Sequence, residues 1–160
     1  MQPRSGLAKR AVDLVASTIG LILSSPVLLP TMYAVWRQDR HSPFYIAGRV
    51  GRDGSGFNMV KLRSMVIGAD RSGVDSTAAD DIRITPAGRF IRQYKLDELT
   101  QLWNVLRGDM SLVGPRPNVR RETNLYTLEE QRLLSVKPGI TDFASIVFSD
   151  EGEILDGSPD

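Results

Sequence analysis

The feature that most constrains this chain is an uncharged, apolar segment near its N-terminus. No charged residue occurs between Leu14 and Trp36. A helix of this length would measure about 34 Å at roughly 1.5 Å per residue, which is enough to cross the hydrocarbon core of a bilayer. The segment shows no convincing small-residue cleavage site, so a secretory signal peptide is the weaker interpretation. Two arrangements stay open: a proline-kinked spanning helix, and a re-entrant helix that enters and leaves through one face of the membrane.

Two features favour the re-entrant arrangement. Ser25 and Pro26 lie near the middle of the segment, where proline removes a helical hydrogen bond and a serine hydroxyl can satisfy the freed carbonyl. Basic residues flank the segment on both sides, with Arg4, Lys9 and Arg10 before it and Arg37 and Arg40 after it. A single span normally carries its basic bias on one side. The flanking charges alone leave the two arrangements about equally supported.

Charge and composition exclude several classes of protein. The 160 residues allow one domain with a modest core. A net charge of +1 argues against nucleic-acid binding driven by phosphate neutralisation. The absence of cysteine excludes disulfides and thiolate metal sites. Basic residues nevertheless cluster locally, as Arg89, Arg92 and Lys95, and as Arg107, Arg116, Arg120 and Arg121. Such clusters on a nearly neutral chain suit a small anionic ligand.

The remaining sequence predicts a small, helix-rich α/β domain. We divide the chain into residues 1–40, the membrane segment with its flanks, and residues 41–160, a domain that forms one functional unit with it and that we expect to carry any active site. Strand-like runs at 44–50 and 57–65 are joined by a glycine-rich turn at 51–56. This pattern is typical of a β-hairpin.

Three helices are predicted to follow the hairpin. The first begins at Thr85-Pro86, with threonine as cap and proline in the first turn. The second spans Asp97 to Arg107, where leucines and Trp103 recur at helical spacing. The third begins at the capping-box pattern of residues 127–130 and ends before Lys137. The other predicted elements are a polar surface loop at 68–81 and a strand at 143–148.

An acidic pair, Asp97 and Glu98, is the strongest candidate for chemistry. Acidic residues are common in the first turn of a helix because they complement its dipole, so the pair alone is weak evidence. The surrounding residues strengthen the case for a functional role of the pair. Arg92 lies upstream, and two prolines hold Arg116 in a stiff loop downstream. Carboxylates beside arginines suit phosphoryl transfer, and Mg²⁺ prefers one or two carboxylates together with phosphate oxygens.

The run from Tyr94 to Pro117, YKLDELTQLWNVLRGDMSLVGPRP, resembles the bacterial sugar transferase family. These are the monotopic polyprenyl-phosphate phosphoglycosyl transferases that start glycan assembly. Further runs resemble family motifs in family order: Lys9–Asp13, Ser25-Pro26, Lys61–Met65 and Lys137–Thr141. The resemblance covers roughly residues 8 to 141, and several long motifs in order make it specific.

The resemblance implies a two-step transfer. Asp97 would attack the β-phosphate of a UDP-sugar and release UMP, and a polyprenyl phosphate would then take the phosphosugar. Glu98 would ligate magnesium. Residues implied in substrate or phosphate binding are Arg92, Arg116, Lys61, Arg63 and Lys137. The re-entrant helix, broken at Ser25-Pro26, would place the protein on the bacterial cytoplasmic membrane, facing the cytoplasm. A homodimer is compatible with the resemblance, and no nucleic acid is implied.

The chain also departs from the family pattern. Thr100 stands where the family often has proline, and residues 142–146 replace a common family run. The chain ends at Asp160, whereas the family usually continues into helices with another functional aspartate. The sequence therefore leaves an alternative: a truncated or degenerate member acting as a non-catalytic membrane scaffold. A soluble glycosyltransferase is disfavoured because no Asp-x-Asp pair follows a strand.

Overall fold

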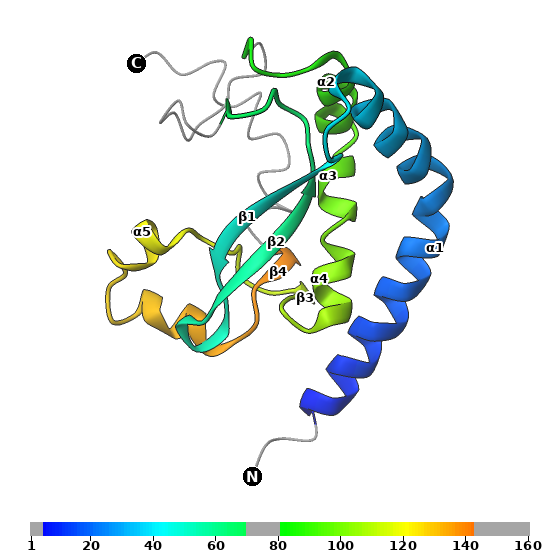
Figure 1. Ribbon diagram of the computed structural model, residues 1–160. Coiled ribbons are helices and arrows are strands. Elements are labelled where there is room, and N and C mark those ends of the chain that lie inside the picture. The colour runs from blue at the N-terminus through cyan, green and yellow to red at the C-terminus, as the bar shows by residue number, and fades with distance from the viewer. Residues whose placement is uncertain (1–4, 70–80, 143–160) are drawn as a thin grey trace.

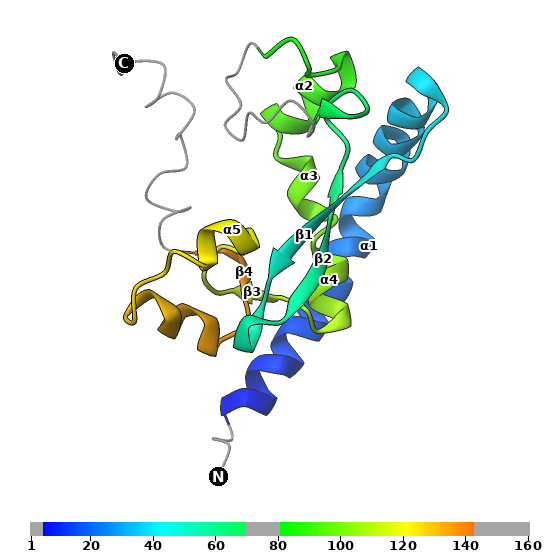
Figure 2. The ribbon, with the colours of Figure 1, turned by 60° about the vertical axis from the view of Figure 1, so that its left-hand side comes forward.

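The computed structural model describes residues 5–69 and 81–142. A long helix, α1 (Ser5–Asp39), precedes a hairpin of β1 (Phe44–Val50) and β2 (Gly56–Leu62), whose turn holds the 3-10 helix η1 (Arg52–Gly54). The later elements are α2 (Pro86–Gln93), α3 (Leu96–Leu99), α4 (Leu102–Arg107), β3 (Ser111–Val113), α5 (Arg120–Thr123), η3 (Glu130–Ser135) and β4 (Gly139–Thr141). The hairpin lies between α3 and α4 on one side and α5 on the other (Figures 1 and 2).

Helix α1 is continuous through Ser25 and Pro26, so the predicted helix-break-helix form is wrong in detail. The Ser25 hydroxyl donates to the carbonyl of Ile22 at 2.7 Å. That carbonyl is the one that the missing N–H of Pro26 leaves without its helical donor. Because the serine supplies a substitute, the helix bends along its length instead of ending (Figure 1).

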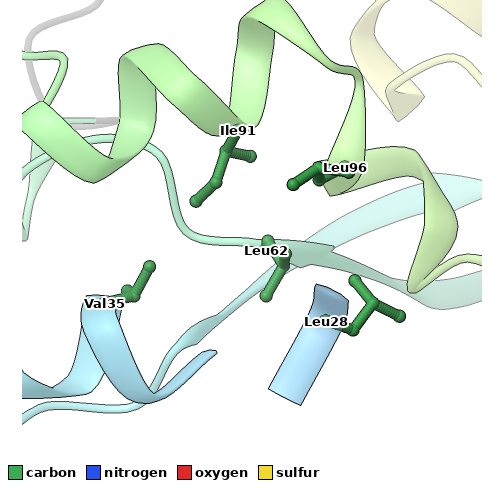
Figure 3. Packing of buried hydrophobic residues seen from close by; sticks show 5 residues of the cluster. All are labelled: Leu28, Val35, Leu62, Ile91 and Leu96. Atoms are coloured by element: carbon green, nitrogen blue, oxygen red, sulfur yellow. The ribbon is translucent and has the colours of Figure 1, made fainter. Parts of the chain in front are cut away.

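One face of α1 packs against the rest of the chain. Leu28 and Val35 of α1 meet Leu62 of β2, Ile91 of α2 and Leu96 of α3, and all five side chains are buried (Figure 3). Each buried aliphatic side chain of this kind stabilises the fold by about 1.5–3 kcal/mol. This cluster joins α1 to the hairpin, to α2 and to α3, the helix that carries the acidic pair.

The other face of α1 is exposed and apolar. Only 17% of its most apolar 18-residue stretch is buried. By length and composition alone, the helix could cross a membrane. Large apolar side chains exposed there are Leu7, Val12, Val15, Ile19, Ile22, Leu23, Leu29 and Tyr33. An apolar surface of this extent is typical of contact with lipid or protein.

Polar contacts fix the N-terminal half of α1 to the catalytic part. Asp13 is buried, and its carboxylate accepts hydrogen bonds from the Ser111 hydroxyl at 2.9 Å and the Leu112 amide at 3.1 Å. The Arg10 guanidinium donates to the carbonyls of Val105 and Leu106, at 2.6 and 2.9 Å. Those carbonyls belong to the last turn of α4, where helical partners are missing. The basic-acidic motif before the apolar segment thus holds α1 to α4 and β3.

The free edge of β2 is covered by side chains from the α3–α4 stretch. Asn104 is fully buried, and its amide oxygen accepts from the Val60 amide at 2.9 Å while its amide nitrogen donates to the Asn58 carbonyl at 2.7 Å. The Thr100 hydroxyl donates to the Val60 carbonyl at 3.1 Å. Threonine at this position, in place of the family's usual proline, therefore bonds a helix to a strand. These bonds satisfy an edge that would otherwise be unpaired.

Several local predictions are confirmed. The hairpin forms in register from Phe44 opposite Leu62 to Val50 opposite Gly56, ending earlier than predicted. Thr85 caps α2 by accepting from the Gly88 amide at 3.0 Å. The capping box of residues 127–130 forms, but the turns that follow are the 3-10 helix η3.

Other predictions need correction. The predicted helix of residues 97–107 is two short helices, α3 and α4, joined by Thr100 and Gln101 in helical conformation. Trp103, one of the residues at helical spacing, is about half exposed and belongs to neither buried cluster. The parallel pair of β3 and β4 was not predicted. The strand predicted at 143–148 lies outside the described residues, and so does the loop predicted at 68–81 apart from residues 68, 69 and 81.

We expect Asn104→Ala to lower the stability of the protein by roughly 2–4 kcal/mol, because it leaves buried groups of β2 without partners. Thermal unfolding in detergent should show a clearly lower Tm than for wild type. Asn124→Ala, at an exposed position after α5, serves as the matched control and should leave Tm unchanged. Equal Tm values for the two variants would contradict this account of the β2 edge.

Candidate functional site

An ion pair between β2 and α3 forms the centre of the candidate site. Lys61 Nζ lies 3.4 Å from Asp97 Oδ2, and both side chains are about one-fifth to one-quarter exposed, at 25% and 19%. The backbone turns sharply before α3 because Lys95 adopts a left-handed conformation, with φ of 51°. This turn starts a new helix at Leu96 and puts the acidic pair in its first turn.

A cavity of about 280 Å³ lies beside this pair. Lys61 lines it, and so do Glu98 from α3 and Arg116 from the loop after β3. The complete lining is Arg49, Met59, Lys61, Glu98, Gln101, Arg116, Pro117, Asn118, Val119, Glu122 and Ile140. The cavity therefore gathers two of the predicted cations and one predicted acid around one space.

The loop that carries Arg116 is held at both ends. Before it, Gly114 crosses the backbone of β4 so closely that a Cβ there would lie 2.4 Å from the Lys137 carbonyl oxygen. After it, Pro117 is buried and the Asn118 carbonyl accepts from the Val50 amide at 2.9 Å. Arg116 itself is exposed. A stiff, anchored loop with an exposed guanidinium lowers the ordering cost of binding a phosphate.

The structure does not bring all predicted phosphate ligands to this cavity. Arg63 is buried and its guanidinium donates to the carboxylate of Asp39 and the carbonyl of Ser42, so it holds the end of α1 to the hairpin. Lys137 lies beside Gly108, at the opposite end of the α3–α4 stretch from Asp97. Neither residue is among the described residues that line the 280 Å³ cavity, so their assignment to substrate or phosphate binding stays a prediction.

Arg92 takes an intermediate position. It lies on α2, and its Nε donates to the Ser64 hydroxyl at 3.2 Å. Among the described residues that line the 280 Å³ cavity, Arg92 does not occur. Its assignment to nucleotide or phosphate binding stays a prediction.

Sequence reasoning missed four polar residues among the described lining of the cavity: Arg49, Gln101, Asn118 and Glu122. Arg49 lies on β1 opposite Phe57, and alternation along the hairpin puts it on the same face as Lys61. The register of the hairpin was the signal that could have found it. Glu122 lies on α5, a four-residue helix whose sequence carries no clear periodic signal.

The residues present fit a magnesium ion held jointly with substrate. Within residues 5–69 and 81–142, no group of three or more acidic or histidine side chains converges as a complete metal site. Magnesium needs only one or two carboxylates when phosphate oxygens supply further ligands. Glu98 offers such a carboxylate at the wall of the cavity, next in sequence to Asp97.

Comparison with known proteins identifies the family of the chain. The family described as bacterial sugar transferase matches residues 4–155, which is nearly the whole chain. The protein therefore belongs to the bacterial sugar transferase family.

Its curated relatives include both shorter and longer proteins. The chain is 42% identical over 152 residues to an undecaprenyl-phosphate galactose phosphotransferase of Salmonella typhimurium, covering 86% of this chain and 32% of that protein. It is 34% identical over 148 residues to the UDP-N-acetylgalactosamine-undecaprenyl-phosphate N-acetylgalactosaminephosphotransferase of Aeromonas hydrophila, covering 91% and 35%. It is 43% identical over 141 residues to the uncharacterized sugar transferase EpsL of Bacillus subtilis, covering 88% and 68%. The chain thus spans about a third of some relatives and about two thirds of others.

We expect Lys137 to titrate below the usual range of a lysine. Burial, followed by the positive charge of Arg10, lowers the pKa of the Lys137 ammonium. The pH dependence of amine acetylation, followed by mass spectrometry, should show a lower midpoint for Lys137 than for a lysine in a short peptide. Arg10→Gln should raise that midpoint, whereas Arg132→Gln should not, because this exposed residue of η3 is not among the charges that shift the pKa of Lys137. A wild-type midpoint at or above the ordinary lysine value would contradict the environment described for this residue.

Proposed function

We propose that this chain transfers a phosphosugar from a UDP-sugar to polyprenyl phosphate, giving a polyprenyl-diphosphate sugar and UMP. The observation that carries the proposal is the Lys61–Asp97 pair, 3.4 Å apart, beside a cavity lined by Glu98 and Arg116. The Salmonella and Aeromonas relatives, both named as phosphotransferases that act on undecaprenyl phosphate, support the same class of reaction.

In the first step, a carboxylate oxygen of Asp97 would attack the β-phosphorus of the donor. The new bond joins Asp97 to the phosphorus, and the bond to the bridging oxygen breaks so that UMP leaves with the electron pair. Lys61 holds the carboxylate in place and is itself close enough to meet a phosphate oxygen. Arg116 offers a fork of N–H donors to the oxygens on which charge accumulates.

In the second step, a phosphate oxygen of the polyprenyl phosphate would attack the same phosphorus. The bond to Asp97 then breaks, which returns the carboxylate and gives the lipid diphosphate sugar. The Asp97 carboxylate bonds to the phosphorus in the first step and leaves it in the second. Because both steps occur at the same phosphorus, a single cavity can serve the donor and then the acceptor.

Magnesium, when bound, would neutralise negative charge on the donor diphosphate. Glu98 is the residue of this chain best placed to hold it together with phosphate oxygens. Glu122, on the same cavity wall, adds a second acidic side chain within the site.

The exposed apolar face of α1 supports an arrangement on the cytoplasmic membrane of a bacterium, with the catalytic part facing the cytoplasm. The bend of α1 and the basic residues at both of its ends favour a re-entrant, monotopic helix. Such a helix would hold the cavity at the membrane surface, where the phosphate of a polyprenyl lipid lies.

The covalent step can be tested by mass spectrometry. Incubation of the full chain with a UDP-sugar and magnesium, without lipid acceptor, should add one phosphosugar to Asp97 and release one UMP. Asp97→Asn should abolish both, because an amide cannot act as the nucleophile. Glu98→Gln should slow adduct formation by at least about a hundredfold if it holds the metal.

Arg132→Gln is the matched control and should form the adduct at the wild-type rate, because this exposed residue of η3 lies outside the described cavity lining. Full transfer by Asp97→Asn would overturn the assignment of the nucleophile. Binding of UDP-sugars without UMP release by wild type would instead support the non-catalytic scaffold.

The topology can be tested with single cysteines because the chain has none of its own. Gly6→Cys and His41→Cys lie near the two ends of α1, at exposed positions. In the re-entrant arrangement, a membrane-impermeant maleimide should label both in inverted vesicles and neither in intact spheroplasts. Labelling of the two positions from opposite sides would establish a spanning helix and reject the monotopic arrangement.

A further inference from the structure

A groove of about 510 Å³ lies beside the candidate site and has no part in the chemistry described so far. Three arginines line it: Arg49 from β1, Arg107 from the last turn of α4 and Arg120 from α5. Arg107 and Arg120 belong to the downstream basic cluster of the sequence. The fold adds Arg49 to them, so the groove concentrates positive charge on a chain whose net charge is only +1.

The arginines are only partly committed to protein partners. Arg107 is about half exposed, and its Nε lies 3.4 Å from a carboxylate oxygen of Asp109, which also lines the groove. Arg120 donates to the Gly54 carbonyl at 2.8 Å, which uses one of the five N–H donors of its guanidinium. The groove therefore presents a guanidinium-rich surface with one acidic side chain among its described lining residues.

The groove and the cavity next to Asp97 adjoin at Arg49, which lines both. The cavity alone, at about 280 Å³, is slightly smaller than the roughly 300–1,000 Å³ of ligand pockets. A nucleotide sugar contains a base, two sugar rings and two phosphates, and so needs more room than the cavity provides. The adjoining groove supplies that room.

We infer that the donor lies across both hollows, with its β-phosphate and sugar beside Asp97 and its nucleoside monophosphate half in the arginine groove. Arg49 stands at the boundary between the two phosphates. This inference rests on the proposed function, because it assigns the two halves of the same donor.

Charge decides which half enters the groove. The α-phosphate gains negative charge when the bond to the β-phosphorus breaks, and three guanidinium groups stabilise that charge. Guanidinium planes also stack on flat bases such as uracil. The sugar half is uncharged apart from its phosphate and needs no such cluster, so the groove fits UMP as the leaving group.

Calorimetric titration of the full chain in detergent with UMP tests the inference. We expect Arg107→Gln to weaken UMP binding about tenfold, and Arg49→Gln at least as much. Arg132→Gln, an exposed arginine outside both described linings, is the matched control and should bind as wild type does. Thermal unfolding of each variant checks that the fold is intact. Galactose 1-phosphate, a probe for the other half, should bind wild type and Arg107→Gln equally.

Any of three results would overturn the inference. The first is that wild type shows no saturable UMP binding, and the second is that the two groove variants bind UMP as tightly as the control does. The third is that Arg107→Gln weakens binding of galactose 1-phosphate but not of UMP, which would put the sugar in the groove. Failure of the proposed function is separate: it would appear as wild type that binds UMP but forms no adduct at Asp97 with any UDP-sugar.

Discussion

The side-chain amide of Asn104 is the interaction on which the candidate site depends. Fully buried, it bonds to both an amide and a carbonyl on the free edge of β2, and the hydroxyl of Thr100 adds a third bond one turn earlier. Together they fix the α3–α4 stretch against the hairpin. Since Lys61 follows the bonded Val60 directly, the edge contact also fixes the distance between the lysine and Asp97. A site made from a strand and a helix acquires its geometry from a contact that touches no substrate.

A second constraint ties this unit to α1. Asp13 is a carboxylate in the protein interior, and a buried charge is tolerated only where hydrogen bonds and opposite charges compensate its lost hydration. The hydroxyl of Ser111, the amide of Leu112 and the ammonium of Lys9 provide that compensation. The cost of breaking these contacts makes α1 an integral part of the fold. The outer face of α1 is therefore apolar, whereas its inner face makes specific polar contacts with the rest of the domain.

The sequence predicted best what is decided locally. The hairpin, the Thr85 cap and the capping box of residues 127–130 each depend on a few adjacent residues, and each forms. Long-range pairing was the part that sequence could not supply. No pattern in the residues around Arg63 predicts its ion pair with Asp39. Strands β3 and β4 have three residues each, which is too few for a periodic signal. The surrounding residues and the resemblance both pointed to the acidic pair, whereas Arg49 came to the cavity through the register of the hairpin, which the sequence analysis did not use.

The attachment of α1 at both of its ends has a mechanical consequence. Asp13 fixes its first half to β3, and Asp39 fixes its last residue to Arg63 of the hairpin. A helix held in this way moves with the catalytic part as one body. In a bilayer thinner or thicker than the apolar face of α1, the angle between helix and cavity could not change to compensate. The lipids around α1 would have to stretch or compress instead. The free-energy cost of the thickness mismatch would then arise from the deformation of the lipids and not from a tilt of the helix.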